Sequence, residues 1–337
     1  MQSDINNLLK LSKAEADKWI RYGLKKKEED EVNILLSEGN EDNLIESFHK
    51  KLEFGTGGMR GLIGIGSNRI NSYTISLATQ GLCNYLNKDI NENKSAVIAY
   101  DSRRFSKEFG YQTAKIFSAN NIKSYIFSDL RPTPELSFAV RELNCTCGIV
   151  ITASHNPKEY NGYKVYWNDG GQITAPHDKN IISEVEKITD FKQINFNFNS
   201  DLIEEIDKKI DKKYIDKIQS LSLYDNSGSK LKIIFSSLHG TGITQIPNAL
   251  KSFGFKNISS VRSQELPDPE FSTVVSPNPE DLDALDLGIK KLKKEKADIL
   301  LATDPDSDRV GVALYVNEKI KILNGNQLAS LIVYYSL

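Results

Sequence analysis

Two hydrophobic patterns alternate along this chain: short apolar runs typical of buried strands, and longer stretches whose apolar positions recur at helical spacing. A polar helical stretch extends to about Lys51, and apolar residues on one side of the segment from Ser72 to Ile90 predict a helix there. The elements predicted next are, in order, a strand from Val97 to Tyr100, a helix with Ser106 as its N-cap that runs to about Asn120, a strand from Tyr125 to Phe127, a helix from Pro134 to Leu143 and a strand from Gly148 to Thr152. Two strand–helix–strand units in succession are typical of a parallel sheet with crossover helices.

The chain after Thr152 divides into a turn region, a connecting helix and a second α/β unit. Asn161-Gly162 predicts a hairpin turn before a strand from Tyr163 to Trp167. Apolar residues at helical spacing predict one linking helix with a solvated face: Ile203, Ile206, Ile210, Tyr214 and Ile218. The second unit is predicted to contain, in order, a strand from Leu231 to Phe235, a helix from Ile243 to Phe253, a loop from Pro267 to Pro279, a helix from Asp281 to about Lys296, and strands from Ile299 to Ala302, Val310 to Val316 and Lys319 to Leu323. We therefore expect the fold class α/β, with consecutive domains that are each a mixed, mostly parallel sheet flanked by helices.

Length and composition exclude several classes of protein. The chain has 337 residues, more than one hydrophobic core usually serves, so two or more domains are expected. Its 43 Lys and Arg residues are balanced by 45 Asp and Glu residues, so no net cationic field attracts nucleic acid or an anionic membrane. No apolar run approaches the roughly 20 residues of a spanning helix, and residues 1–10 lack the pattern of a secretory signal. We expect a cytoplasmic protein that binds neither nucleic acid nor a membrane.

A serine stands in the loop after one of the buried strands, in Thr152-Ala153-Ser154-His155-Asn156-Pro157. The bland interpretation is a hydroxyl that caps the turn at Asn156-Pro157. Ligands of open α/β sheets, however, bind at the carboxyl ends of strands, which favours a functional Ser154. The Gly-x-Ser-x-Gly pattern of hydrolases is absent. We interpret Ser154 as a hydroxyl that carries a phosphoryl group and His155 as its electrostatic or proton-handling neighbour, and we expect Lys164 to return toward the same loop.

Three carboxylates alternate directly after the apolar strand from Ile299 to Ala302. In an extended or tightly turned segment, Asp304, Asp306 and Asp308 can direct three oxygens to one cation. A calcium EF-hand fails because Arg309 stands where that loop needs glycine. Transition metals are disfavoured because no His or Cys is near in the sequence. Hard oxygen ligands beside an arginine suit Mg²⁺ and a phosphate.

Three further segments carry weaker signals. The glycines of Phe54 to Gly61 allow close approach to an anion, and Arg60 offers a fork of donors, although no Walker motif is present. Asp101-Ser102-Arg103-Arg104 follows another strand and has similar weight, so Arg103 is also a candidate for substrate binding. His239 to Gly242 is weaker still, because it equally suits a turn that enters a helix.

Together, the segments 54–61, 152–167 and 304–309 resemble the α-D-phosphohexomutases, and within them most of all the phosphoglucomutase 2/phosphopentomutase branch. The resemblance implies reversible phosphoryl transfer through a phosphoserine at Ser154, with Mg²⁺ as cofactor and glucose 1,6-bisphosphate as activator. It implies the following roles: Ser154, Asp304, Asp306 and Asp308 as metal ligands, Lys164 and His155 as acid/base groups with Ser154 as the catalytic carrier, and Arg60, Arg103, Asn156 and Arg309 as substrate-binding residues.

The resemblance also predicts a domain organisation and a reaction. Residues 1–200 would form domain I with the serine loop, residues 201–320 domain II with the metal loop, and residues 321–337 the start of a third domain whose remainder is absent. We expect the N-terminal part of an isomerase that interconverts sugar 1- and 6-phosphates, with glucose as the first candidate sugar. A phosphopentomutase and a phosphosugar-binding module without turnover remain alternatives. So does a phosphatase of the haloacid dehalogenase type, which would not account for the serine loop.

Overall fold

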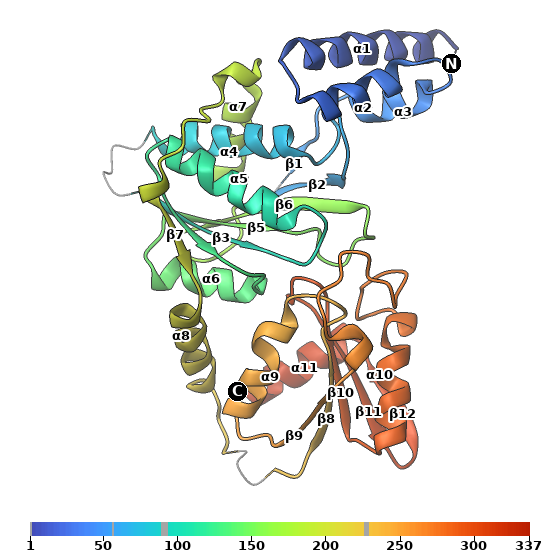
Figure 1. The fold of residues 1–337 in the computed structure, drawn as a ribbon. Helices are drawn as coiled ribbons and strands as arrows, with labels where there is room; N and C mark the ends of the chain where they lie inside the picture. Colours follow the sequence, from blue (N-terminus) through green and yellow to red (C-terminus); the bar gives the residue numbers. More distant parts are fainter. Residues whose placement is uncertain (1, 56, 89–93, 226–228) are drawn as a thin grey trace.

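Two α/β units follow one another along the chain (Figure 1). The structure is a computed structural model and describes residues 2–55, 57–88, 94–225 and 229–337. Thr56 of the glycine-rich segment and Ile90, the expected end of a helix, lie outside the described residues. Each unit contains one sheet with helices packed against it, so the expected fold class is confirmed. Among the described residues, no helix combines the length and apolarity needed to cross a bilayer.

The first unit contains a seven-stranded mixed sheet with the order β1-β2-β6-β5-β3-β4-β7. Its strands are β1 (Phe54–Gly55), β2 (Gly58–Leu62), β3 (Ser95–Tyr100), β4 (Lys123–Phe127), β5 (Cys147–Ile151), β6 (Tyr160–Trp167) and β7 (Ile203–Ile206). Strands β5, β3, β4 and β7 are parallel, whereas β6 runs antiparallel to β5 on one side and to β2 on the other. Strand β5 is therefore a central strand of the sheet. Because it is parallel to β3, the loops that follow these two strands leave from the same end of the sheet.

Helices cover both faces of the first sheet, so its central strands are buried on both sides. Side chains of β3 alternate accordingly: Ala96 and Ile98 belong to one core cluster, and Val97 and Ala99 to the other. The helices of this unit are α1 (Gln2–Arg21), α2 (Lys26–Leu36), α3 (Glu41–Phe48), α4 (Ser72–Leu86), α5 (Ser106–Ala119), α6 (Thr133–Glu142), α7 (His177–Glu186) and α8 (Lys208–Gln219), with short 3₁₀ turns at Phe191–Gln193 and Ser200–Leu202. Figure 1 shows α4 and α5 on one face with α1 to α3 beyond them, and α6 on the face toward the second unit.

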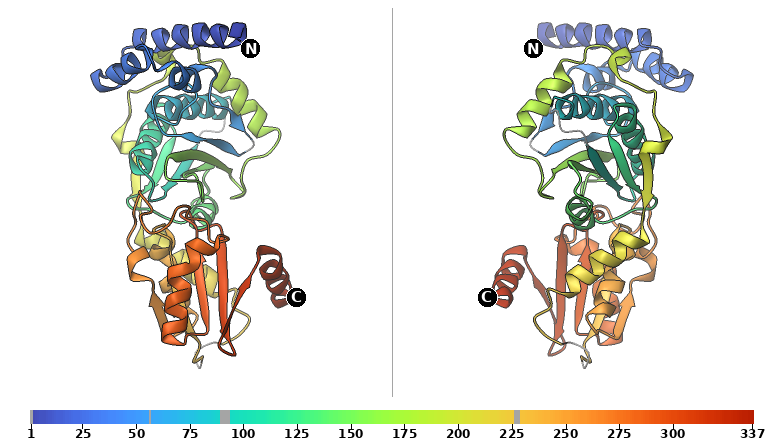
Figure 2. Two further views of the ribbon diagram at one scale, coloured as in Figure 1. Left: turned by 90° about the vertical axis from the view of Figure 1, so that its right-hand side faces the viewer. Right: turned by 90° about the vertical axis from the view of Figure 1, so that its left-hand side faces the viewer.

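The second unit contains a five-stranded sheet with the order β12-β11-β10-β8-β9. Its elements are β8 (Lys232–Ser236), α9 (Gly242–Ser252), β9 (Asn257–Ser260), a 3₁₀ turn at Arg262–Gln264, α10 (Leu282–Glu295), β10 (Ile299–Thr303), β11 (Val310–Val316), β12 (Lys319–Leu323) and α11 (Gly325–Ser336). Strands β9, β8 and β10 are parallel, and β11 and β12 are antiparallel additions. Helix α11 stands apart from this sheet in Figure 2, and none of its residues is buried.

Two of the predicted local signals are wrong. Asn161-Gly162 is not a hairpin turn but lies inside β6, where a Cβ on Gly162 would come within 2.5 Å of the Thr152 carbonyl oxygen and 2.7 Å of the Met59 carbonyl oxygen. The glycine permits close approach of three backbones rather than a change of direction. Ser106 is not an N-cap, because α5 starts at Ser106 itself, after Phe105, and the Ser106 hydroxyl donates to Asp101 Oδ1 at 2.8 Å.

Two predicted helices have different limits. Helix α4 ends at Leu86 rather than at Ile90. The predicted linking helix is a strand followed by a helix, because Ile203 to Ile206 pair in parallel with β4 and only the residues from Lys208 onward are helical. Strand β7 thus completes the first sheet, and a domain boundary at residue 200 would separate it from that sheet. The domain boundaries stay predictions.

Candidate functional site

The loops after β5 and β10 meet between the two sheets. Ser154 lies in the first loop and Asp304 in the second, and the Ser154 hydroxyl donates a 2.6 Å hydrogen bond to Asp304 Oδ2. Ser154 is 2% exposed and Asp304 is fully buried. The carboxyl ends of two central strands, one from each sheet, thus meet at one buried point.

The acidic loop is held in a tight turn by its own backbone and by the loop after β8. Asp304 Oδ1 accepts the N–H groups of Asp308 and Arg309, each at 3.1 Å. From the other side, the Thr241 N–H donates to the Pro305 carbonyl oxygen at 2.8 Å. A Cβ on Gly240 would overlap the backbone of Pro305, so only glycine fits there. The segment His239 to Gly242, judged weak in the sequence, therefore supports the acidic loop.

The three alternating aspartates converge, as the sequence suggested. One carboxylate oxygen from each of Asp304, Asp306 and Asp308 lies within 4.8 Å of the others. Lys164, on β6, reaches the same cluster, with its ammonium donating to Asp306 Oδ2 at 2.6 Å and to Asp308 Oδ2 at 2.9 Å. Strand β6 therefore places the lysine opposite Val150, near the end of β5, with its ammonium against the acidic loop.

These residues fit a divalent cation. Asp306 Oδ1 is buried and has no hydrogen-bond partner among the described residues, although an unpaired buried carboxylate oxygen is costly. It belongs to the only cluster of three or more possible metal ligands found in the described part of the chain. All three ligands are carboxylates, the donor type that hard ions such as Mg²⁺ and Ca²⁺ prefer.

The charges of this cluster shift several pKa values in opposite directions. Burial, together with the negative charges of Asp306 and Asp308, raises the pKa of Asp304 well above its usual range. Burial also works to raise the pKa of Asp306, but the Lys164 ammonium outweighs it, so that this pKa is lowered. Burial works to lower the pKa of Lys164, but the two aspartates outweigh it and raise the pKa. Lys164 is therefore protonated at neutral pH.

Three polar residues surround the serine at the open side of the site. His155 Nδ1 lies 3.3 Å from Ser154 Oγ. Burial and the positive charges of Arg309 and Arg60 lower the pKa of His155, so the neutral imidazole is favoured at neutral pH. Arg60 is exposed and donates to Asn156 Oδ1 at 2.9 Å. Arg309 is also exposed, and its side chain has no ion-pair partner among the described residues, so it is available to an anion.

Arg103 is placed differently from the other predicted substrate-binding residues. It is 3% exposed and lies behind the serine loop, where its guanidinium donates to four carbonyl oxygens of residues 154–160. It forms an ion pair with Asp101, whose side chain is likewise inaccessible to solvent. The structure thus brings Arg60, Asn156 and Arg309 to the open side and Arg103 to the buried side.

Two threonines of the site escaped the sequence analysis. Thr133 donates to Asp306 twice, from its N–H to the carbonyl oxygen and from its hydroxyl to Oδ2, both at 2.9 Å. Thr152 Oγ1 accepts the Ser154 N–H at 2.8 Å. Thr133 is the first residue of α6, just after the loop that follows β4, so its place beyond a parallel strand was the signal available. Its contact with a residue of the other unit was not.

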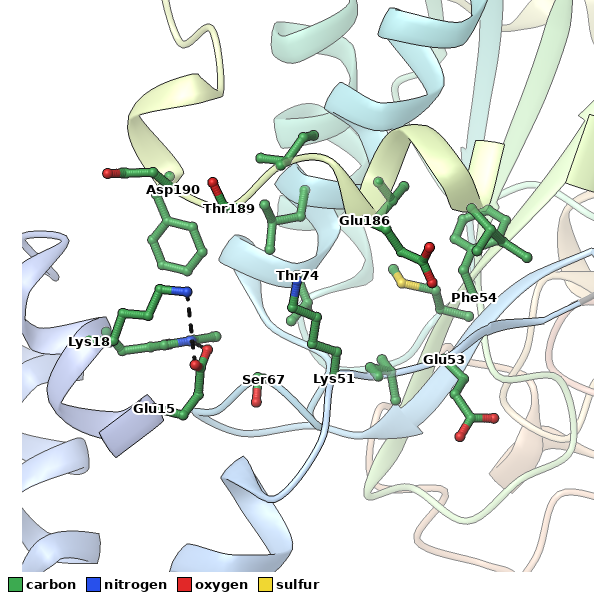
Figure 3. Close-up of a pocket in the computed structure, with 18 of the residues that line it drawn as sticks. Glu15, Lys18, Lys51, Glu53, Phe54, Ser67, Thr74, Glu186, Thr189 and Asp190 are labelled. Atoms are coloured by element: carbon green, nitrogen blue, oxygen red, sulfur yellow. Dashed lines mark hydrogen bonds and ion pairs between the residues drawn. The ribbon is translucent and has the colours of Figure 1, made fainter. Parts of the chain in front are cut away.

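A separate cavity of about 340 Å³ lies between α1, the β1–β2 hairpin and α7 (Figure 3). Its lining is mainly apolar, and Figure 3 shows the Lys18–Glu15 pair on one side and Glu186 on the other. None of the predicted site residues lines it. The candidate site is therefore the junction of the two loops and not this cavity.

Comparisons of the sequence with known families identify both units. Residues 51–192 match phosphoglucomutase/phosphomannomutase, alpha/beta/alpha domain I, and residues 212–316 match alpha/beta/alpha domain II of the same family. Phosphoglucomutases of Staphylococcus aureus are 41–42% identical over 296 residues, which are 87% of this chain and 53% of theirs. The chain therefore spans about half the length of these curated relatives.

Solved structures agree in fold. A Thermus thermophilus protein assigned to the phosphomannomutases matches with a TM-score of 0.73 and 27% identity, over 85% of this chain and 61% of that one. A Burkholderia thailandensis protein of the phosphoglucomutase/phosphomannomutase family matches in fold with a TM-score of 0.66 and 21% identity, over 83% and 57% of the two chains. These matches confirm the expected superfamily. The predicted branch within it stays a prediction.

Proposed function

Because the chain belongs to the phosphoglucomutase/phosphomannomutase family, we propose that it takes part in reversible phosphoryl transfer between Ser154 and a sugar 1- or 6-phosphate, with glucose as the first candidate sugar. The observation that supports this best is the 2.6 Å hydrogen bond between Ser154 Oγ and Asp304 Oδ2, which joins a nucleophile to a carboxylate cluster. The match covers only 53% of the length of the Staphylococcus aureus relatives, so the activity of the whole protein is part of the proposal.

In this proposal Ser154 Oγ forms the new bond to phosphorus while the bond from phosphorus to the sugar oxygen breaks. The serine must lose its proton in that step. Asp304 Oδ2 at 2.6 Å and His155 Nδ1 at 3.3 Å are the nearest acceptors, and the lowered pKa of His155 keeps its imidazole neutral and able to accept. Lys164 is protonated at neutral pH and is the acid in this proposal, which would give its proton to the departing sugar oxygen.

The remaining predicted residues bind charge. Asp304, Asp306 and Asp308, with an oxygen of phosphorylated Ser154, would hold Mg²⁺. Bound there, Mg²⁺ would offset the negative charge of the phosphoryl group in transfer. Arg60 and Arg309 lie on the open side, where guanidinium groups can contact phosphoryl oxygens, and Asn156 is held by Arg60.

The proposal extends to the activator and the compartment. Glucose 1,6-bisphosphate would phosphorylate Ser154 and so start the cycle. We place the protein in the cytoplasm because Cys83, Cys145 and Cys147 are free, as is usual for cysteines in reducing compartments.

Phosphorylation of the serine tests the proposal directly. We expect incubation with glucose 1,6-bisphosphate and Mg²⁺ to add one phosphoryl group, which intact-mass measurement detects and peptide mapping assigns to Ser154. The Ser154→Ala variant should take up none, whereas Ser183→Ala, which changes an exposed serine on α7, should behave as the wild type. A hydroxylamine-labile phosphate on an aspartate would instead identify a phosphatase of the haloacid dehalogenase type, and no uptake at all would contradict phosphoryl transfer.

A further inference from the structure

A buried ion pair lies directly behind the serine loop. Arg103 Nε is 3.3 Å from Asp101 Oδ2, and neither side chain is accessible to solvent. Burial of two charges is costly unless every polar atom around them is used, so their hydrogen bonds show what the pair holds. In this protein all four hydrogen bonds of the guanidinium lead to the backbone of residues 154–160, and one of the three that Asp101 accepts comes from Thr152.

The guanidinium fixes the segment that follows the serine. Arg103 Nη2 donates to the carbonyl oxygens of Ser154 at 2.7 Å and Asn156 at 2.5 Å, and Nη1 donates to those of Pro157 at 2.8 Å and Tyr160 at 3.0 Å. These four bonds use all four terminal N–H groups of the side chain. The fifth donor, Nε–H, lies 3.3 Å from Asp101 Oδ2 without a hydrogen-bond partner among the described residues, but it is buried and so is closed to a sugar or a phosphate.

The carboxylate fixes the peptide that precedes the serine. Asp101 Oδ2 accepts the Thr152 hydroxyl at 2.6 Å, and the same hydroxyl oxygen accepts the Ser154 N–H at 2.8 Å. Asp101 Oδ1 accepts the Arg103 N–H and the Ser106 hydroxyl, which holds the carboxylate itself in place. One ion pair therefore holds both backbone groups of Ser154: Asp101 holds the N–H through the Thr152 hydroxyl, and Arg103 holds the carbonyl oxygen directly.

This double restraint matters because Ser154 has an unfavourable backbone conformation. Its φ angle is +54°, in the left-handed region that residues other than glycine rarely adopt. Such a conformation persists only where the surrounding structure enforces it. In it, the Ser154 hydroxyl reaches Asp304 Oδ2.

The second unit covers the ion pair from the other side. The guanidinium carbon of Arg103 lies 5.0 Å from the ring centre of Phe271, a residue that is 1% exposed. The neighbouring Glu270 pairs with Arg104 and with Lys158, so this loop contacts both the segment after β3 and the serine loop. Water is thus excluded from the pair, which strengthens its hydrogen bonds.

We propose that the Asp101–Arg103 pair is a positioning device that holds Ser154 in its left-handed conformation and directs its hydroxyl to Asp304, in place of the substrate contact suggested for Arg103 by the sequence. The proposal rests on the proposed phosphoryl transfer for its effect on rate. The effect of the ion pair on the geometry of Ser154 is inferred from the hydrogen bonds alone.

The kinetic test is phosphorylation of Ser154 by glucose 1,6-bisphosphate, followed over time by intact mass at several concentrations of the donor. Arg103→Lys keeps the charge but cannot bind four carbonyl groups, and Thr152→Val removes only the hydroxyl that links Asp101 to Ser154. We expect both variants to lower the maximal rate, by on the order of 10- to 100-fold for Arg103→Lys, because small misplacements of a reacting group have effects of that size. The half-saturating concentration should stay unchanged. A weaker half-saturation at an unchanged maximal rate would identify Arg103 as a substrate ligand and overturn the proposal.

Arg104→Lys is the matched control, since Arg104 is the adjacent arginine, has a side chain that is 54% exposed and pairs with Glu270 rather than with the serine loop. It should react at the wild-type rate. If Arg103→Lys fails to fold, as thermal melting would reveal, Thr152→Val decides the question.

Crystal structures of the same two variants separate this proposal from the proposed function. We expect Ser154 to leave the left-handed region and its hydroxyl to leave Asp304, while both sheets stay unchanged. If the wild type takes up no phosphate, the proposed function fails and the crystal structures still decide the positioning role. If Ser154 keeps its conformation and its contact with Asp304 in both variants, the positioning role is refuted, whatever the wild type does.

Discussion

Replacement of Lys164 by methionine is expected to tighten the binding of a divalent cation to the three aspartates. The Lys164 ammonium lies 2.6 Å from Asp306 Oδ2 and 2.9 Å from Asp308 Oδ2, so it occupies two of the carboxylates that a cation would use. Its raised pKa keeps it charged throughout the neutral range. Methionine has a similar length and no charge, so the variant removes a competing cation and little packing.

The size of the effect follows from Coulomb's law. Two unit charges about 4 Å apart interact by about 1 kcal/mol in water and about 4 kcal/mol at an effective dielectric constant of 20. Repulsion of a dication by the ammonium is twice as large, from about 2 to 8 kcal/mol. We take the lower figure, because the lysine side chain can turn away when the cation arrives. It corresponds to about 30-fold tighter binding.

Isothermal titration calorimetry with Mg²⁺ measures this affinity without any turnover. Lys158→Met is the matched control, because Lys158 lies on the serine loop with a side chain that is 47% exposed and pairs with Glu270 rather than with an aspartate of the site. Thermal melting gives a second readout. The metal-free Lys164→Met protein should be less stable, since loss of one partner of a buried pair costs about 3–5 kcal/mol, and Mg²⁺ should restore more stability to it than to the wild type.

Equal or weaker Mg²⁺ affinity in Lys164→Met would refute this reasoning. It would mean that the lysine does not compete for the aspartates, and that the cation binds elsewhere or with the lysine as a favourable neighbour.

Two further predictions concern stability. Burial and the charge of Asp211 raise the pKa of Glu135 to about 9, above its unfolded value of about 4.3, so the stability that this group contributes is fully present below about pH 4 and is lost as the pH rises toward 9. In the wild type, chemical denaturation should therefore show a loss of up to about 4 kcal/mol between about pH 5 and 8, and Glu135→Gln should remove that loss. Parallel stability profiles of the two proteins would contradict this. Gly162→Ala should destabilise the protein by about 3 kcal/mol in the same assay, because its Cβ would lie 2.5 Å from one backbone oxygen and 2.7 Å from another, whereas Gly55→Ala, whose Cβ meets nothing closer than 3.8 Å, should have little effect.

The chemistry of each loop could be predicted because it depends on short stretches of sequence. Two apolar strands are followed by polar loops, Thr152 to Pro157 and Asp304 to Arg309. These loops lie at the carboxyl ends of strands, where α/β proteins bind ligands. Contact between the loops does not follow from these short stretches; it was expected only from the family resemblance, which made Ser154 and the three aspartates ligands of one metal. Ser154 and Asp304 are 150 residues apart, and their hydrogen bond depends on how two separate sheets pack together. The role of Arg103 behind the serine loop depends on the same packing.

Local signals failed where a neighbouring strand decided the structure. Asn-Gly usually marks a turn, but Gly162 lies between two backbones, because the short glycine-rich strand β2 pairs with β6, and β2 has no apolar run to reveal it. Ile203 and Ile206 are three residues apart, a spacing that suits a helix, yet they form a strand because they pair with the otherwise open edge of β4. In both cases tertiary contacts overrode a local preference.

Because the site is divided between the two units, its reaction depends on their being packed together. Ser154 belongs to the first unit and Asp304 to the second, and along the chain the two units are joined only through α8 and the segment that follows it. A cut between α8 and β8 would leave each core intact and separate the serine from the aspartates. Exchange of phosphate at Ser154 would then register whether the two fragments had found each other, which makes this junction a natural split reporter for protein association.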